Sequence, residues 1–422
     1  MNRSFAALRT DSNAQVTEQS TAEQFVNVRI VVLATALLVA CHSPQQMPAP
    51  AHGATDVGTP QTLATDSRYI PAADRRPGVF PPAWRHKAGR APTFGSHAMV
   101  ASDAPLGSAA GVEILRKGGN AVDAAVAVGF AIAVAFPEAG NIGGGGYMVI
   151  HMADGRSAAL DYREIAPLAA TRNMYLDANG KLTDRSIVGP TASGVPGAVA
   201  GLTEALAKYG TMRLADVMAP AIRYAEEGFV VDSAFASSVR GNQKLLTQFG
   251  GAALLLPGGT PLAAGSRLTQ PALAKTLRAI AAQGRSAFYE GAIAESWTRE
   301  LRNAGGIITM ADLQSYKPVW REAVKSTYRG YSLLTMPPSS SGGVTITETM
   351  NILEGFDSLP AYGSAGWAHV LGSAYQRAFI DRNEKLADPA FVAVPISQLT
   401  DKKYAASLRA TIGTMRATPT ST

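Results

Sequence analysis

The apolar positions of the chain fall into short runs separated by glycine, proline and helix-capping residues, most clearly after residue 96. The stretch 97–102 predicts a short strand. A helix should follow it, with Asp103 as its cap and Pro105 in its first turn, where the missing N–H would be unpaired in any case. Gly118 marks the end of that helix, because glycine adopts the left-handed conformation without strain.

The next predicted helix is apolar on almost every side. It should begin after Asn120, which can cap it, and run to Phe136, directly before Pro137. Asp123 lies in its first turn, where a carboxylate interacts favourably with the helix dipole. A helix that is apolar all round lies either in a membrane or deep in a core. Because this one is short, alanine-rich and acidic at one end, we expect it in the core, packed against a sheet.

A hairpin is predicted directly after the glycine run Gly143–Gly146. Two strands, 147–152 and 157–164, flank the sequence Ala-Asp-Gly-Arg, and Asp-Gly is a strong hairpin-turn signal. Helices and strands thus mix with a hairpin, which indicates an α/β or α+β fold with some antiparallel sheet. The remaining predicted elements are helices over 196–208, 271–283, 291–303, 309–315, the segment ending at Gly355 and 364–386, and a strand over 328–338.

Composition indicates a globular protein. Of the 422 residues, 46% are hydrophobic and 17% are charged, so the chain can bury a substantial core. The net charge of +6 is spread thinly: the densest basic cluster is Arg85–Lys87, and no run of five Lys or Arg residues occurs. Nucleic-acid binding needs a concentrated basic face, so we expect no nucleic-acid partner.

Cysteine and histidine usage gives no sign of a metal site. Cys41 is the single cysteine, so no intrachain disulfide can form. None of the six histidines pairs with another at the i, i+4 spacing of a metal-binding helix, and the sequence HExxH is absent. We therefore expect neither a structural zinc site nor another cofactor.

The N-terminal region predicts export. Ile30–Ala40 is a charge-free, almost wholly apolar run that is too short to span a bilayer but has the length of a secretory signal core. Residues 38–41, Leu-Val-Ala-Cys, resemble a bacterial lipoprotein box, so residues 1–41 are predicted to be an export signal that leaves Cys41 lipidated on a periplasmic protein. The alternative is a lone cysteine in a stray apolar segment. Residues 42–92, rich in Pro, Ala and Gly, should form a tether, and the folded domain should span 93–422.

Two loops could be mistaken for catalytic motifs. The run Gly143–Gly146 does not continue as G-x-G-x-x-G, because Met148 and Val149 occupy the positions where glycine is needed. Close backbone approach at the start of a strand explains it better. Pro337–Gly343 could cap a helix or face an anion, and since it lacks the G-x-S-x-G pattern, Ser339–Ser341 are weak candidates for a nucleophile.

Arg163 is the sharpest candidate for binding. On a strand its neighbours Tyr162 and Glu164 would point to the opposite face, so Glu164 is a poor partner and the arginine needs an anion from elsewhere. A guanidinium matches a carboxylate through two parallel hydrogen bonds. The residues alone leave three interpretations open: a carboxylate-binding group, a structural salt bridge, or a solvated strand end.

Several segments together resemble the γ-glutamyltransferase (glutathione hydrolase) family. The likeness extends from about Met99 to Leu408 and keeps the family order of motifs. The segments that carry it are MVASDAPLGSAAGVEILRKGGNAVDAAVA, NIGGGGYMVI, LDYREIAP, GVPGAVAGL, KYGTM, YRGYSLLTMPPSSSGGVTI and NILEGFD.

This resemblance implies an N-terminal nucleophile hydrolase with a four-layer αββα sandwich. Such proteins are made as one precursor that cuts itself before a threonine, giving a large and a small subunit. The new N-terminal threonine attacks γ-glutamyl amides such as glutathione, and water or an amino acid or peptide acceptor resolves the acyl-enzyme. By the same resemblance Arg163 binds the α-carboxylate of the γ-glutamyl group, while the glycine run and Pro337–Gly343 shape the pocket walls.

At its end, the sequence departs from the family pattern. The nucleophilic threonine is expected downstream of Thr422, since Thr420 and Thr422 lack the following histidine of the family pattern. We therefore expect no catalytic residue in this chain, which should be the large-subunit part and inactive without its small-subunit partner. The alternatives are a lipid-anchored, non-catalytic binding protein on the same scaffold, or a related acylase of the cephalosporin or glutaryl type.

Overall fold

The structure, a computed structural model, describes residues 94–413 and 416–418. All of them belong to the larger of the two compact units into which the chain divides. The predicted export signal with Cys41, the predicted tether, and the two threonines Thr420 and Thr422 lie outside the described residues. Those interpretations stay predictions.

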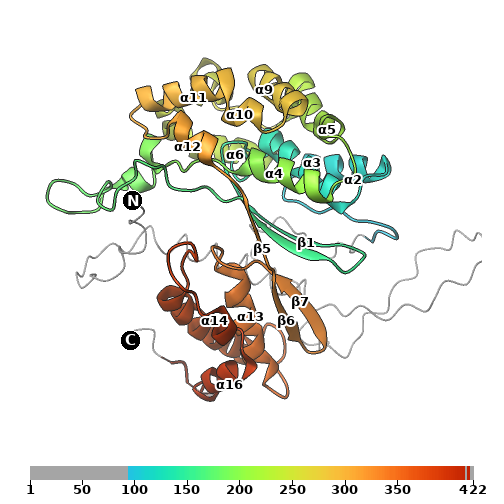
Figure 1. The fold of residues 1–422 in the computed structure, drawn as a ribbon, viewed down its shortest axis with the longest axis vertical. Coiled ribbons are helices and arrows are strands. Elements are labelled where there is room, and N and C mark those ends of the chain that lie inside the picture. Colours follow the sequence, from blue (N-terminus) through green and yellow to red (C-terminus); the bar gives the residue numbers. More distant parts are fainter. Residues whose placement is uncertain (1–93, 414–415, 419–422) are drawn as a thin grey trace, which may run out of the picture. The chain divides into compact units, whose positions relative to one another are not determined.

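The described chain is a mixture of helices and short antiparallel strands (Figure 1). Its elements, in chain order, are α2 (Pro105–Arg116), α3 (Ala121–Ala135), β1 (Tyr147–His151), β2 (Ser157–Asp161), the 3₁₀ turns η2 (Asp184–Ser186) and η3 (Pro190–Ala192), α4 (Ala198–Tyr209), α5 (Leu214–Glu227), β3 (Phe229–Val230), α6 (Ser233–Gly241), α7 (Gln243–Gln248), α8 (Ala252–Leu255), η4 (Pro257–Gly259), β4 (Arg267–Leu268), α9 (Pro271–Gln283), α10 (Ser286–Tyr289), α11 (Gly291–Asn303), α12 (Met310–Ser315), β5 (Val319–Arg321), β6 (Val324–Tyr328), β7 (Tyr331–Thr335), α13 (Gly342–Glu354), α14 (Ala365–Lys385), α15 (Ile396–Leu399) and α16 (Lys402–Ala410).

Helix α3 forms the centre of the main core, as its all-round apolar pattern predicts. It packs against α2, α4 and α5, and α5 in turn packs against α9. Phe130, Ala131 and Val134 of α3 are completely buried. No helix in the described part of the chain is long and apolar enough to cross a membrane.

The start of α3 is fixed by a capping box. The Asn120 side chain accepts hydrogen bonds from the N–H groups of Val122 and Asp123, and the Asp123 carboxylate accepts one from the N–H of Asn120. Asp123 is fully buried and also accepts from the backbone N–H groups of Thr211 and Met212 and from the Thr211 hydroxyl. Burial alone would raise the pKa of Asp123, but these hydrogen bonds outweigh it and lower the pKa. The predicted cap is confirmed.

The beginning of the domain differs from its prediction. Residues 97–102 form no strand, because no segment of the described chain pairs with them. Asp103 does not cap α2, whose N-cap is Ala104 without a side-chain hydrogen bond. The Ser102 hydroxyl bonds instead to the Ala104 carbonyl and the Ser108 hydroxyl. The predicted stop is right, since Gly118 has a φ of 90°.

The predicted hairpin is confirmed: it is formed by β1 and β2, two strands of a three-stranded antiparallel sheet in the order β1–β2–β5. Strand β2 ends at Asp161, so the predicted strand 157–164 is three residues too long and Arg163 lies beyond it. The chain leaves the ladder because the Arg163 N–H bonds to the Asp161 carboxylate instead of a neighbouring strand. Tyr162 still points away from Arg163, into the main core.

Most later predictions hold to within a few residues, and one strand is shorter than predicted. The strand expected over 328–338 is β7, which begins at Tyr331. A two-residue turn with positive φ at Arg329 (47°) and Gly330 (86°) precedes it and pairs β7 with β6. Helix α5, with Pro220 inside it, is an element that the sequence reasoning missed.

Helix α13 packs against α14, α16, β6 and β7 (Figure 1). A pair of carboxyl groups is buried between α13 and α14. Glu348 of α13 and Asp381 of α14 are 1% and 5% exposed. Lys385 Nζ and the Tyr404 hydroxyl donate to the two oxygens of Asp381, each at 2.6 Å. Burial and a hydrogen bond to Asp381 raise the pKa of Glu348 to about 9. Against the effect of its own burial, the hydrogen bonds from Lys385, Tyr404 and Glu348 lower the pKa of Asp381. Glu348 is therefore protonated at neutral pH, and Asp381 carries the charge.

The raised pKa of Glu348 predicts a loss of stability with increasing pH. The folded state retains the proton of Glu348 while the unfolded chain releases it above its ordinary value of 4.5, so this contribution is complete below pH 4.5 and is lost as the pH rises towards 9. We expect Glu348→Gln to flatten the fall in melting temperature between pH 5 and pH 9, measured by circular dichroism. Glu354→Gln, which breaks the ion pair of the same helix with Lys402, should leave that fall unchanged. An equal slope in wild type and Glu348→Gln would contradict the assignment.

Candidate substrate-binding site around Arg163

Arg163 lies two residues past the end of β2, with an exposed side chain. No carboxylate among the described residues forms an ion pair with it, and its Nη1 donates to the Tyr147 hydroxyl at 3.5 Å. That hydrogen bond, with help from neighbouring negative charges, raises the pKa of Arg163. The guanidinium is therefore a fixed cation whose other N–H groups remain available to an anion from outside this part of the chain.

The orientation of Arg163 depends on a chain of hydrogen bonds that ends on Asp161. Since the Ser339 hydroxyl donates to Asp161 Oδ2 at 2.9 Å, the Tyr147 hydroxyl, 3.0 Å from Ser339, must donate to Ser339 and accept from Arg163. Arg321 closes the chain: its Nε donates to the same Asp161 oxygen at 3.0 Å, and its Nη2 lies 2.9 Å from that oxygen in the ion pair. Asp161 is 7% exposed, so this is a mostly buried ion pair.

The sheet register brings these groups together. Tyr147 is directly opposite Asp161 in the β1–β2 pair, and Arg321 comes from the adjacent strand β5. Along β2 the side chains alternate: Leu160 enters the main core, whereas Ala159 packs with Ala323 and Met336. Asp161 lies on the same face of the strand as Ala159. Ser339 completes the arrangement, since it follows Met336 by three residues in the sequence.

The backbone of Arg163 is held as firmly as its side chain. The Tyr316 hydroxyl donates to the Arg163 carbonyl at 2.9 Å, and Tyr316 is stacked on Tyr289 with ring centroids 5.8 Å apart. The Tyr289 hydroxyl in turn donates to the carbonyl of Pro196. Both tyrosine side chains are almost completely buried, so Arg163 projects from a rigid base.

The glycine run serves close backbone packing, as the sequence suggested. A Cβ on Gly145 would lie 2.6 Å from the Tyr162 carbonyl oxygen and 2.8 Å from the Glu164 nitrogen. The Gly144 carbonyl accepts hydrogen bonds from the N–H groups of Gly197 and Ala198. The run thus presses directly against the backbone that carries Arg163.

The serines of the loop Pro337–Gly343 have different roles: one caps helix α13, and another belongs to the candidate site. Ser341 is the N-cap residue of α13, but its side chain caps no N–H; the Ser340 hydroxyl accepts from the Gly342 N–H instead. Ser339 belongs to the hydrogen-bond chain of Arg163 and donates its proton to a carboxylate, and no histidine of the described residues is hydrogen-bonded to it. It has the environment of a structural hydroxyl rather than an activated nucleophile.

Sequence reasoning identified Arg163 and missed the groups that orient it: Tyr147, Asp161, Arg321 and, in this role, Ser339. The hairpin register could have revealed the first two, because a turn at Asp-Gly places Tyr147 opposite Asp161. Within the described residues, no group of three His, Cys, Asp or Glu side chains is arranged to hold a metal ion.

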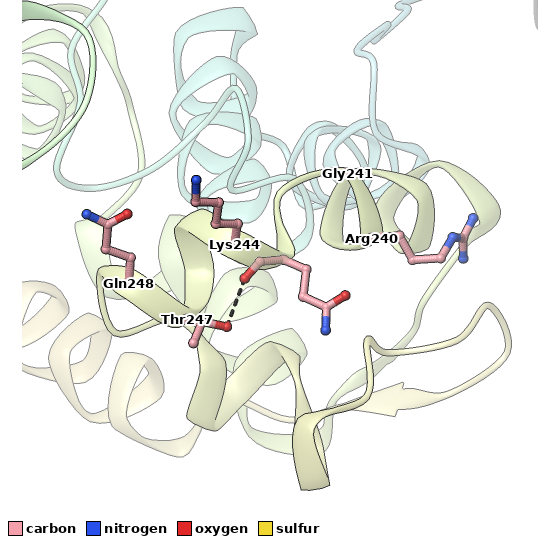
Figure 2. Close-up of a pocket in the computed structure, with 6 residues that line it drawn as sticks. Arg240, Gly241, Lys244, Thr247 and Gln248 are labelled. Atoms are coloured by element: carbon pink, nitrogen blue, oxygen red, sulfur yellow. Dashed lines mark hydrogen bonds between the residues drawn. The ribbon is translucent and has the colours of Figure 1, made fainter. Parts of the chain in front are cut away.

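A separate surface hollow of about 680 Å³ lies along α6 and α7 (Figure 2). Its lining side chains are exposed, and the one hydrogen bond drawn there joins the Thr247 hydroxyl to the Gln243 carbonyl at 2.9 Å. Neither Arg163 nor any group of its hydrogen-bond chain lines this hollow. The polar residues around Arg163, not this hollow, form the candidate site.

Comparison with known proteins agrees with the motifs. Residues 107–422 match the family described as Gamma-glutamyltranspeptidase. The chain belongs to the γ-glutamyltranspeptidase family. It is 46% identical over 338 residues to a glutathione hydrolase proenzyme of Pseudomonas sp. strain A14, covering 79% of this chain and 58% of that relative. It is also 46% identical over 331 residues to the acylase ACY 1 proenzyme of Pseudomonas sp. strain SE83, covering 76% and 59%. The chain thus spans less than two thirds of the length of these relatives.

The fold of the chain agrees with solved members of this family. The Helicobacter pylori γ-glutamyltranspeptidase structure superposes with a TM-score of 0.76 at 40% identity, covering 78% of this chain and 96% of that one. The predicted fold class, an α/β N-terminal nucleophile hydrolase of the αββα type, is confirmed.

The buried pair of Asp161 and Arg321 predicts a large effect of Asp161→Ala. Removing the carboxylate leaves Arg321, whose side chain is 21% exposed, without its partner, so we expect a loss of about 2–3 kcal/mol in the free energy of unfolding. Urea denaturation followed by fluorescence measures it. Asp154→Ala, which breaks the exposed pair with Arg156 at the tip of the same hairpin, is the matched control and should change little. Equal effects of the two substitutions would show that the buried pair has no special role.

Proposed function

We propose that this chain is the large-subunit part of a γ-glutamyltransferase, a glutathione hydrolase, in which Arg163 binds the α-carboxylate of the γ-glutamyl group. The observation that carries the proposal is the geometry of Arg163. Its guanidinium is exposed, has no ion-pair partner in the described chain, and is oriented through Tyr147 and Ser339 by the buried Asp161. Orienting a cation in this way at an exposed position suits the two-point binding of a carboxylate.

The division into two parts is supported by the lengths of the relatives. The named proenzymes are covered to 58–59%, whereas the H. pylori chain is covered to 96%. The segment that matches is therefore the size of a whole chain in a solved γ-glutamyltranspeptidase. In our proposal the remainder of the precursor supplies the small subunit and the nucleophilic threonine.

The chemistry in this proposal needs positioning from Arg163 and covalent chemistry from the partner. The threonine hydroxyl attacks the γ-carbonyl, its proton passes through the threonine amine to the leaving nitrogen, and the amide C–N bond breaks to leave an ester. Water or an acceptor amine then attacks the ester, which releases glutamate or a new γ-glutamyl compound and restores the hydroxyl. With the α-carboxylate on Arg163, the γ-carbonyl is held at one place, and such positioning accounts for a large share of catalysis.

A related acylase activity is the second candidate, because the acylase ACY 1 proenzyme is as similar to this chain as the glutathione hydrolase proenzyme. A glutaryl group has the same carbon chain and terminal carboxylate as a γ-glutamyl group, but it lacks the α-amine. Arg163 would bind the carboxylate of either. The choice between γ-glutamyl and glutaryl substrates therefore depends on contacts to the α-amine, which we assign to the proposed small subunit.

Substitution of Arg163 tests the proposed binding role in the two-subunit enzyme. Arg163→Ala should raise KM for γ-glutamyl-p-nitroanilide by roughly 30- to 100-fold, because a charge-assisted pair of hydrogen bonds is lost. The KM of Arg163→Lys should lie between the values for wild type and Arg163→Ala, because lysine keeps the charge but lacks the planar guanidinium that makes two parallel hydrogen bonds. Tyr147→Phe should raise KM roughly threefold by releasing the guanidinium.

The matched control for these variants is Arg156→Ala, an exposed arginine on the same hairpin. Its KM should equal that of wild type. An unchanged KM in Arg163→Ala would refute the binding role.

The two candidate activities are separated by paired substrates. The proposal predicts that kcat/KM for γ-glutamyl-p-nitroanilide exceeds that for glutaryl-p-nitroanilide by roughly 100-fold or more, because a site built to pair the α-amine is left with unpaired polar groups when it is absent. Release of p-nitroaniline reports both reactions. A preference for the glutaryl compound would favour the acylase instead.

A further inference from the structure

Arg377, near the middle of α14, is a buried cation. The residue is 7% exposed, and no carboxylate pairs with it in the described chain. Burial lowers the pKa of its guanidinium. A buried charge that has no opposite charge is costly, so such a residue usually has a specific role.

All five N–H donors of Arg377 are used, and every acceptor is a neutral oxygen. Nε donates to the Thr411 hydroxyl at 2.7 Å, and Nη2 donates to the Thr411 carbonyl at 2.7 Å and the Thr418 hydroxyl at 3.0 Å. Nη1 donates to the Ser373 carbonyl and the Gln376 side chain within the same helix. Three of the five bonds thus leave α14 and hold the segment that follows α16.

Two neighbours on α14 make further bonds to this segment. His369 Nε2 donates to the Gly413 carbonyl at 2.6 Å, and Gln376 Nε2 donates to the Thr418 carbonyl at 3.2 Å. Helix α16 ends at Ala410, so from Thr411 onward the described segment has no regular structure of its own. Its course is set by α14, and Arg377 supplies three of these bonds.

We propose that Arg377 is a positioning residue for self-cleavage of the precursor, because it bonds Thr411 and Thr418 to α14 and so sets the course of the chain towards the bond that is cut. The inference rests on the proposed function, in which residues that follow in the precursor supply the threonine. In the cleavage step the threonine hydroxyl attacks the carbonyl carbon of the preceding peptide bond, the C–N bond breaks and the nitrogen takes up the hydroxyl proton. Water then hydrolyses the ester to a C-terminal carboxylate and a free hydroxyl.

The physical effect is a restriction of the chain. A segment fixed at Thr411 and Thr418 starts from one place, so the residues beyond it explore fewer conformations before the scissile bond reaches its reactive geometry. Lysine at position 377 would keep the charge, but its single ammonium lacks the planar fork that bonds Thr411 and Thr418 together. Arg377→Lys therefore separates the geometry of the contact from its charge.

Limited trypsin digestion of the full chain tests this contact independently of self-cleavage. Arg416 is exposed and lies within the held segment. Cleavage after Arg416, followed by mass spectrometry, should be roughly tenfold faster in Arg377→Lys, because the segment opens more often. Tyr404→Phe is the matched control: it removes the hydrogen bonds of the hydroxyl with Asp381 and Lys385, both on α14, and this hydroxyl has no hydrogen bond to the described residues 411–413 and 416–418. Equal cleavage rates in Arg377→Lys and Tyr404→Phe would overturn the proposal.

Self-cleavage of the full-length precursor tests the consequence. We expect the half-life of the uncut precursor to lengthen roughly three- to tenfold in Arg377→Lys and to stay at the wild-type value in Tyr404→Phe. Once processed, Arg377→Lys should show wild-type kcat and KM, which a general loss of structure would not preserve. If the wild-type precursor does not cut itself, the proposed function fails and this inference with it. If wild type and Arg377→Lys cut at the same rate, the inference alone fails.

Discussion

The buried carboxylate of Asp161 joins the parts of the structure on which the candidate site depends. It is the last residue of β2, it pairs with Arg321 of β5, and it accepts the hydroxyl proton of Ser339 from the loop before α13. Through its other oxygen it bonds the Arg163 N–H and ends the strand there. Without this charge, the guanidinium of Arg321 would lose its partner and Arg163 would lose the hydrogen bonds that orient it. Removing the two charges of the pair from water costs free energy, but the pair fixes the geometry of the side chains around it.

Two arginines near Asp161 therefore have different tasks. Arg321 is mostly buried and neutralises the carboxylate, while Arg163 remains exposed and contacts that network only through the Tyr147 hydroxyl and its own backbone. Because Arg321 already neutralises the carboxylate of Asp161, no ion pair within the described residues uses the positive charge of Arg163, as its proposed carboxylate-binding role requires. Neutralising one arginine internally and leaving the other exposed is how a site can be rigid and still attract an anion.

The parts of the fold that could be predicted are those whose cause is local. Asn120 caps α3 because its own next residues supply the N–H groups, and Asp-Gly closes the hairpin within a few residues. The strand expected at 97–102 is absent because a strand needs a partner from elsewhere in the chain, which pattern does not reveal.

The candidate site shows the same limit. Arg163 was recognisable as an arginine beside a strand without a local partner, but its supporting groups come from far along the sequence. Ser339 is 178 residues from Asp161, and Tyr316 is 153 residues from Arg163. Periodicity could not place the end of β2 either, since a side chain of the strand itself captures the next free N–H. Such contacts follow from tertiary structure and not from spacing.

The cap of α3 has a consequence for the order in which the protein can fold during synthesis. Asp123 lies in the first turn of α3 in the main core, but three of the groups that donate to it belong to Thr211 and Met212, nearly 90 residues later. Until the ribosome has released those residues, the Asp123 carboxylate has the N–H of Asn120 as its local partner, and water must satisfy the rest of its hydrogen-bonding capacity. Helix α3 therefore cannot settle into its final environment as it emerges, and the core around it must wait for the loop after α4.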